Sequence, residues 1–207
     1  MASLPARPAI AFLASHNGTN MRAIVAACRA GRLRATPVVL ISNNADSAAM
    51  AWAKDNKLPA VHISAKAKGS EAAADAAIAA TLAQYGADLV VLAGYMRKLG
   101  PETLGSFERR ILNVHPALLP KFGGHGMYGA HVHTAVLAAG ERETGATIHL
   151  VDGEYDQGPV IAQAKVVVEA GDRPETLAAR VQAKEEELFP ETLRRIISRE
   201  IDLDRQP

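Results

Sequence analysis

Cysteine is nearly absent from this sequence. Cys28 is the only one among 207 residues, so no disulfide can form within the chain, and we expect a cytoplasmic protein. An excess of one charge is also missing. The 23 basic and 22 acidic residues leave a formal net charge of +1, which provides no electrostatic footprint for nucleic acid or an anionic membrane.

Long apolar runs are missing as well. No stretch approaches the roughly 20 residues that cross a bilayer, and residues 1–8 lack the apolar core of a secretory signal. The hydrophobic fraction of 48% and the charged fraction of 22% are those of an ordinary globular protein. No repeat or linker divides the chain, so we expect one domain over residues 1–207, with a frayed polar tail from about residue 202.

A convincing metal motif is also absent. His125, His131 and His133 lie close together in the sequence, but no cysteine or carboxylate accompanies them at a trusted ligand spacing. We therefore expect no metal.

Short apolar runs alternate with helical patterns along the chain. The runs are residues 9–14, 38–41, 60–63, 88–93 and 111–115, and helices are expected after Asn20, after Asp46 as a cap, and over residues 70–84. This alternation predicts an α/β, Rossmann-like, mostly parallel twisted sheet with helices on both faces. Residues 145–152 and 160–168 predict an antiparallel edge hairpin. Asp172 is expected to cap a long final helix that Pro190 kinks or breaks.

The fifth apolar run ends in a chemically active pair. Asn113 and His115 are two residues apart, so both side chains point to one face if the segment is extended. An amide can hydrogen-bond an oxyanion, and an imidazole can move a proton near neutral pH. The alternative is that Asn113 caps a turn and His115 is a half-buried surface histidine.

Residues 15–20 form a small polar loop between the first strand and its helix. Such a loop aims backbone N–H groups and the positive end of the helix at an anion, although it matches neither G-x-G-x-x-G nor a P-loop. A capped helix with a polar turn is the alternative. Arg97, after the fourth strand, could hold a second anion or lie on the solvated surface.

Two later segments could complete a site. The turn at residues 152–159 carries Asp152, Glu154 and Asp156, and one of these carboxylates could orient His115. Solvation and turn capping would explain the same residues. Residues 122–129 contain four glycines, which suits a mobile cover over a site.

Three pieces in this order resemble one family, the folate-dependent glycinamide ribonucleotide transformylases. The pieces are residues 15–20, 113–120 and 152–159, and the similarity runs from about Ala9 to about Ile197. The resemblance implies a single formyltransferase domain whose N-terminal half binds the ribonucleotide. Its C-terminal half would bind folate and carry the catalytic residues.

The resemblance also implies roles for individual residues. The catalytic residues would be Asn113, His115 and Asp156. The ribonucleotide and its phosphate would be bound by Asn17, Gly18, Thr19, Asn20, Gln182 and Glu185. The folate pocket would be lined by Met96, Arg97, Leu99, Asn113, Asp152 and Asp156.

The implied reaction is direct transfer of the formyl group of 10-formyltetrahydrofolate to the amine of glycinamide ribonucleotide, in purine synthesis. The implied partners are these two small molecules, with no nucleic acid and no membrane, and the chain is expected to be a monomer or a homodimer. The first alternative is formyltetrahydrofolate deformylase, a hydrolase that resembles this domain but carries a further N-terminal domain. Methionyl-tRNA formyltransferase and a non-catalytic binding module are further alternatives.

Overall fold

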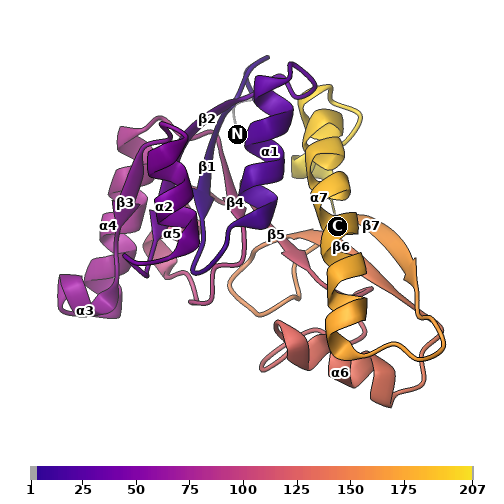
Figure 1. Cartoon of the computed structure of the whole chain (residues 1–207). Helices are drawn as coiled ribbons and strands as arrows, with labels where there is room; N and C mark the ends of the chain where they lie inside the picture. Colours follow the sequence, from indigo (N-terminus) through magenta and orange to yellow (C-terminus); the bar gives the residue numbers. More distant parts are fainter. Residues whose placement is uncertain (1–3, 207) are drawn as a thin grey trace.

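Seven strands form one sheet in the computed structural model, which describes residues 4–206 (Figure 1). Their order across the sheet is β3-β2-β1-β4-β5-β6-β7. The first five are parallel, β6 is antiparallel to β5, and β7 is antiparallel to β6. The predicted mostly parallel sheet and its antiparallel hairpin are therefore confirmed. The strands are β1 (Ala9–Leu13), β2 (Thr36–Ser42), β3 (Ala60–His62), β4 (Leu89–Leu92), β5 (Ile111–His115), β6 (Glu143–Leu150) and β7 (Val160–Val167).

Helices cover both faces of this sheet, as the alternating pattern predicted. Side chains of β1 alternate between two cores: Ile10 and Phe12 pack with α1 and α7, whereas Ala11 and Leu13 pack with α4. In Figure 1, α7 lies beside α1 and continues past β6 and β7. The helices are α1 (Thr19–Arg29), α2 (Ala48–Asp55), α3 (Ala65–Lys68), α4 (Glu71–Gln84), α5 (Pro101–Ser106), α6 (Ala130–Ala138) and α7 (Pro174–Ile197).

The chain changes direction across the sheet between β1 and β4. From β1 it moves outward to β3 and then returns to the other side of β1, so the loops after β1 and β4 diverge at their carboxyl ends. Ligands of open α/β sheets bind at such a point. Ser15 braces it, because its hydroxyl accepts from the Met96 amide at 2.7 Å and donates to Asn43 Oδ1 at 2.6 Å.

Several local predictions were wrong. Asp46 does not cap α2, because the helix begins at Ala48 and the adjacent Ser47 accepts from its first turn. Arg173, not Asp172, is the N-cap of α7, and the Asp172 carboxylate binds Arg180 instead. The short helix α5 was not predicted.

Pro190 was expected to kink or break helix α7, and the break is wrong, because the helix runs through Pro190 continuously. Proline removes one helical hydrogen bond. The side chains of Phe189 and Leu193, which flank Pro190 in the sequence, are buried in the core, so tertiary packing stabilises the helix at this point.

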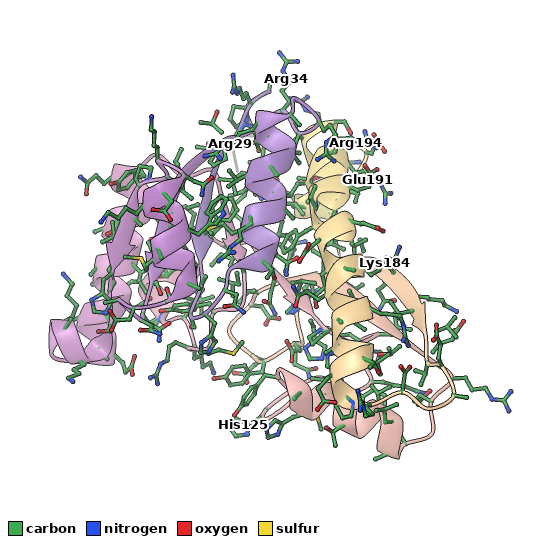
Figure 2. All side chains as sticks on the ribbon, in the orientation of Figure 1. Arg29, Arg34, His125, Lys184, Glu191 and Arg194 are labelled. Atoms are coloured by element: carbon green, nitrogen blue, oxygen red, sulfur yellow. The ribbon has the colours of Figure 1, made fainter. Side chains whose placement is uncertain are left out.

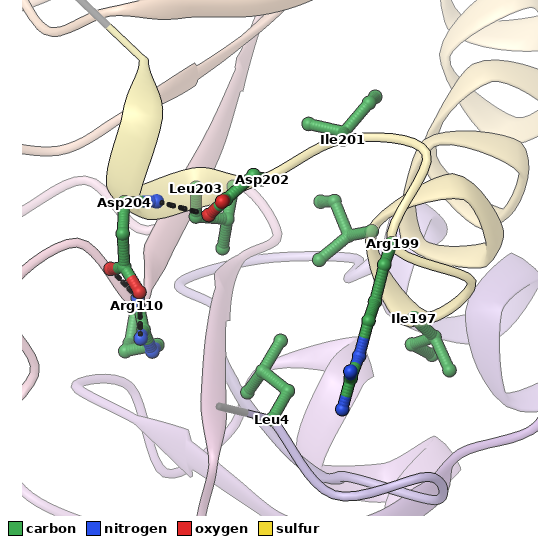
Figure 3. Close-up of a pocket in the computed structure, with 9 residues that line it drawn as sticks. Leu4, Arg110, Ile197, Arg199, Ile201, Asp202, Leu203 and Asp204 are labelled. Carbon is green, nitrogen blue, oxygen red and sulfur yellow. Dashed lines mark hydrogen bonds and ion pairs between the residues drawn. The ribbon is translucent and has the colours of Figure 1, made fainter. Parts of the chain in front are cut away.

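The C-terminal segment is docked rather than frayed as far as residue 206. A 3-10 helix spans Leu203–Arg205, Leu203 is buried, and Arg110 pairs with Asp204 at 2.8 Å. This segment, Leu4 and the end of α7 enclose a cavity of about 260 Å³ (Figure 3). The cavity lies next to Arg110, which directly precedes β5. It is therefore at the amino-terminal end of that strand, opposite the polar loops at the carboxyl ends.

The expected tail also includes residue 207, and the expected domain includes residues 1–3. These four positions lie outside the described residues. Among residues 4–206, no helix is both long and apolar enough to span a bilayer.

Candidate active site

Strand β5 carries both Asn113 and His115, as predicted. The strand is extended because its apolar residues pair with β4 on one side and with β6 on the other. Asn113 is half-buried, and His115 is only 3% exposed. In the antiparallel register with β6, Asn113 lies opposite His149 and His115 lies opposite Thr147. The pair is therefore held at the carboxyl end of a central strand.

The imidazole of His115 lies between two acceptors. Its Nδ1 atom is 3.3 Å from Asp156 Oδ2, and its Nε2 atom is 2.7 Å from the carbonyl oxygen of Phe122. Burial lowers the pKa of His115 from its ordinary value, against the opposing influence of Asp156 and of the Phe122 carbonyl. Both ring nitrogens therefore face an acceptor, whereas burial favours the neutral form of the ring.

Asp156 connects two histidines. Its Oδ1 atom is 3.4 Å from His149 Nε2, while Oδ2 faces His115 and also accepts from the Gly124 amide at 3.0 Å. Burial raises the pKa of Asp156, but the hydrogen bond from His149, the charge interaction with His115 and the Gly124 amide outweigh it. The net pKa lies below the ordinary value. The carboxylate is thus kept ionised beside His115.

His149 belongs to this cluster, and the sequence analysis missed it. Its Nε2 atom is 3.1 Å from Asn113 Nδ2, and its Nδ1 atom is 2.8 Å from the carbonyl oxygen of Leu150. The available signal was a histidine in an otherwise apolar strand that could pair with β5. Without the strand register, that signal does not identify the partner.

The glycine-rich segment lies directly against the cluster. Phe122 supplies the carbonyl that contacts His115, and Gly124 supplies the amide that contacts Asp156. A Cβ atom on Gly123 would lie 2.4 Å from Leu119 Cδ2 and 3.3 Å from Asp156 Cβ, so a side chain here would have to displace Leu119. The segment covers the site in this structure, whereas its mobility stays a prediction.

A cavity of about 80 Å³ opens in front of Asn113, His149 and Asp156. The predicted folate residues Arg97 and Leu99 line it, together with Tyr95, Lys98, Leu104, Val151, Gly153, Glu154 and Tyr155.

Three other predicted residues do not line this cavity. Met96 is exposed, and its amide bonds Ser15. Asp152 accepts from the Glu154 amide at 3.2 Å within the turn. His115 contacts Asp156, which lines the cavity, but does not line it itself.

The predicted anion loop ends at a helix whose start has no side-chain cap. Gly18 is the N-cap of α1 with φ of 61° and, as a glycine, has no side chain with which to cap the first turn. Its left-handed conformation and the nearby Ala49 Cβ, 3.1 Å from a built Cβ, both favour glycine. Thr19 is partly exposed and Asn17 is exposed. The uncapped amides leave this end of the helix available to an anion.

Helix α7 brings one of its two predicted residues to this loop. Glu185 is 8% exposed, and its Oε2 atom accepts from Asn20 Nδ2 at 2.9 Å. Burial raises the pKa of Glu185 to about 7. Asn20 Oδ1 is buried and has no hydrogen-bond partner among residues 4–206. Gln182 is exposed and donates to Glu186 Oε1 at 3.0 Å, so it does not join the Asn20–Glu185 pair.

The three loop histidines are spread over different contacts. His125 packs edge-on against Tyr155, His131 stacks on Tyr128, and His133 is buried. Within residues 4–206, no group of three or more His, Cys, Asp or Glu side chains is arranged to hold a metal ion.

Comparison with known sequences finds one family over most of the chain. A family model described as formyl transferase matches residues 9–193. The chloroplastic phosphoribosylglycinamide formyltransferase of Arabidopsis thaliana is 42% identical over 190 residues, which cover 91% of this chain and 65% of that protein. The enzyme of the same name from Escherichia coli is 39% identical over 181 residues, covering 87% of this chain and 83% of that protein. The chain therefore spans just under two thirds of the plant relative.

Solved structures agree with the sequence comparison. Glycinamide ribonucleotide transformylase 1 from Symbiobacterium toebii superposes with a TM-score of 0.88 at 39% identity, covering 93% of this chain and 89% of that one. A formyltetrahydrofolate deformylase from Pseudomonas syringae reaches a TM-score of 0.82 at 25% identity. It covers 93% of this chain, which spans only 62% of the deformylase.

Proposed function

This chain belongs to the formyl transferase family, and we propose that it transfers the formyl group of 10-formyltetrahydrofolate to the amine of glycinamide ribonucleotide. The products would be formylglycinamide ribonucleotide and tetrahydrofolate, in purine synthesis. The observation that carries the proposal is the position of Asp156, within 3.4 Å of two imidazoles beside the cavity that Asn113 also lines.

In the proposed reaction, the amine nitrogen attacks the formyl carbon and forms a tetrahedral intermediate with a negative oxygen. The Asn113 amide has two N–H groups, and His149 Nε2 can accept at most one of them, so the other is free to donate to that oxygen. Protonated His115 would donate a second hydrogen bond. Removal of one such donor typically raises the barrier by about 3 kcal/mol.

Asp156 would act through His115. Its carboxylate favours the protonated imidazole and fixes the orientation of the ring. When the intermediate collapses, the bond from the formyl carbon to the folate nitrogen breaks. That nitrogen gains the proton that the amine loses, and the sequence of steps needs neither a metal nor a covalent enzyme intermediate.

The Nε2 atom of His115 has to be released from its present contact before it can donate to the intermediate. Phe122 occupies its Nε2 atom, and the imidazole does not line the cavity. We therefore place a shift of residues 122–124 before the chemical step.

The ribonucleotide would bind at the other end of the crevice. Its phosphate would lie over the uncapped start of α1, contacting the amides near Gly18 and Thr19. Asn20 and Glu185 together present a buried acceptor pair beside that helix end, which suits hydroxyl groups of a ribose. Asn17 and Gln182, both exposed, stay predictions as ligand contacts. The monomeric or homodimeric state and the cytoplasmic location also stay predictions.

An assay of loss of the formyl group from 10-formyltetrahydrofolate, with and without glycinamide ribonucleotide, tests the proposal. Loss that requires the ribonucleotide is the expected result. Equal loss without it would identify a deformylase instead. No loss in either case would indicate a binding module or a different acceptor.

A further inference from the structure

Three side chains meet across the mouth of the 80 Å³ cavity. Lys98, from the segment after β4, places its Nζ atom 3.6 Å from Glu154 Oε1 and 5.7 Å from the centroid of the Tyr155 ring. Glu154 and Tyr155 belong to the turn after β6. Tyr155 is itself braced by His125, with ring centroids 5.9 Å apart; Figure 2 labels His125 at the end of the molecule near α6. Lys98 therefore bridges two walls of the cavity.

This bridge has to open for a ligand of folate size. Pockets for such ligands have volumes of roughly 300–1,000 Å³, several times the volume observed here. The side chains of Lys98 and Glu154 are 51% and 77% exposed. An ion pair with that exposure contributes little net free energy, because solvent and salt screen it. The walls can therefore separate at low cost when another group replaces either partner.

The charges that line the cavity indicate which partner is replaced. The carboxylate of Asp156 is already held by His115, His149 and the Gly124 amide. Glu154 has only Lys98 as an ion-pair partner among the described residues. Movement of Glu154 into solvent would leave the Lys98 ammonium at the mouth, close to the face of Tyr155. A carboxylate on the ligand could then take the position of Glu154.

We propose that Lys98 binds a tail carboxylate of the folate co-substrate, exchanging its ion pair with Glu154 for one with the ligand. The inference rests on the proposed function, which supplies a co-substrate with an apolar ring system and a glutamate tail. The tail carboxylates are ionised at neutral pH. Lys98 would thus affect binding of the co-substrate and leave the chemical step unchanged, with Tyr155 positioning its ammonium group.

Direct binding of tetrahydrofolate, measured by calorimetry without ribonucleotide, tests this inference. Lys98→Met keeps the length of the side chain and removes its charge, and should weaken binding about fivefold. Lys98→Arg should bind within about twofold of the wild type. Lys165→Met is the matched control, because Lys165 is 70% exposed, pairs with Glu143 at 2.8 Å and does not line the cavity. Its binding should equal that of the wild type.

A second ligand separates charge from packing. For tetrahydrofolate whose tail carboxylates have been converted to amides, wild type and Lys98→Met should bind equally. Glu154→Gln removes the competing carboxylate and should tighten binding of the acid form. Equal loss of affinity for both ligands in Lys98→Met, or no loss for either, would overturn the inference.

The outcome for the wild type distinguishes the two proposals. If the wild type binds no tetrahydrofolate, the proposed function and the inference both fail. If the wild type binds it and Lys98→Met binds equally well, only the assignment of Lys98 fails.

Discussion

The Nε2 atom of His115 lies 2.7 Å from the carbonyl oxygen of Phe122, so the backbone of the glycine-rich segment covers the proposed catalytic imidazole. The same segment donates the Gly124 amide to Asp156. Two backbone groups thus hold this segment on the cluster. Binding of substrate at His115 requires the first of these contacts to break.

Gly123→Ala tests whether the glycine-rich segment has to pack closely against Leu119 and Asp156. A Cβ atom at this position would lie 2.4 Å from Leu119 Cδ2, and Leu119 is buried. We expect the free energy of unfolding to fall by about 1–3 kcal/mol, as for other overpacked sites, and kcat to fall because the segment is displaced from Asp156. Urea denaturation and steady-state kinetics measure the two effects. Gly105→Ala is the control, because its Cβ would meet no atom within 4 Å; if both variants behave alike, the close approach has no role.

His115→Ala should reduce kcat by about 10²–10⁴-fold, the usual contribution of a positioned acid or base. The dissociation constant of the ribonucleotide should stay within about twofold, because the proposed ribose contacts are Asn20 and Glu185, and His115 makes no hydrogen bond to either. Single-turnover kinetics and equilibrium binding separate the two quantities. His62→Ala, an exposed histidine at the end of β3, should leave both unchanged. Near-normal turnover of His115→Ala would refute the assignment.

Asp156→Asn should change the pH profile of turnover as well as its maximum. The carboxylate raises the pKa of His115, so its loss should lower that pKa further. If the protonated ring is the active form, activity falls as pH rises through its pKa, and this fall should move to lower pH in the variant. Profiles of kcat/KM against pH measure the shift. A profile that drops in height without moving would mean that Asp156 does not act through His115.

Asn20→Ala should weaken ribonucleotide binding and have less effect on folate binding. The change removes the amide that binds Glu185 and also a buried oxygen that has no hydrogen-bond partner within the described part of the chain. Loss of one hydrogen bond with a buried group left unsatisfied corresponds to about 1–3 kcal/mol, or roughly 5- to 150-fold in the dissociation constant. Titration with each substrate separately gives both affinities. A larger effect on folate would mean that the two subsites are exchanged.

Glu185→Gln should make the protein more stable at alkaline pH. Burial raises the pKa of Glu185 from 4.5 to about 7, so between these values the folded state holds a proton that the unfolded chain has released. Stability contributed by this proton is present at low pH and is lost as pH rises through that window. At pH 8, ionisation of Glu185 lowers the free energy of unfolding of the wild type by on the order of 3 kcal/mol. A glutamine cannot ionise, and its amide can donate to Asn20 Oδ1.

Urea denaturation of wild type and Glu185→Gln at pH 5 and pH 8 checks this expectation. The free energy of unfolding of the variant should rise relative to that of the wild type between pH 5 and pH 8. Glu187→Gln is the control, because Glu187 is exposed and pairs with Lys184 at 2.6 Å. An identical pH dependence in wild type and Glu185→Gln would show that Glu185 does not titrate in this range.

Much of the fold follows from local patterns in the chain. The apolar run at Ala9–Leu13 is buried on both faces, as a central parallel strand requires, and such runs identified five strands. The caps were less predictable, since Asp46 and Ser47 are both suitable residues and only the observed start of α2 selects between them. The predicted break at Pro190 was wrong because a local rule does not include the packing of Phe189 and Leu193.

The sequence by itself determined that Asn113 and His115 share one face of a strand, because a strand has a period of two residues. It also determined that a small polar loop precedes α1, whereas the structure showed that its N-cap is a glycine without a side-chain cap. Only the tertiary structure decided that His149 joins Asn113, because that contact depends on the register of β6 against β5. Packing of α7 against α1 likewise buried Glu185 and left Gln182 in solvent. Local periodicity sets where a side chain points, whereas its partner comes from a distant part of the chain and depends on the packing of the whole fold.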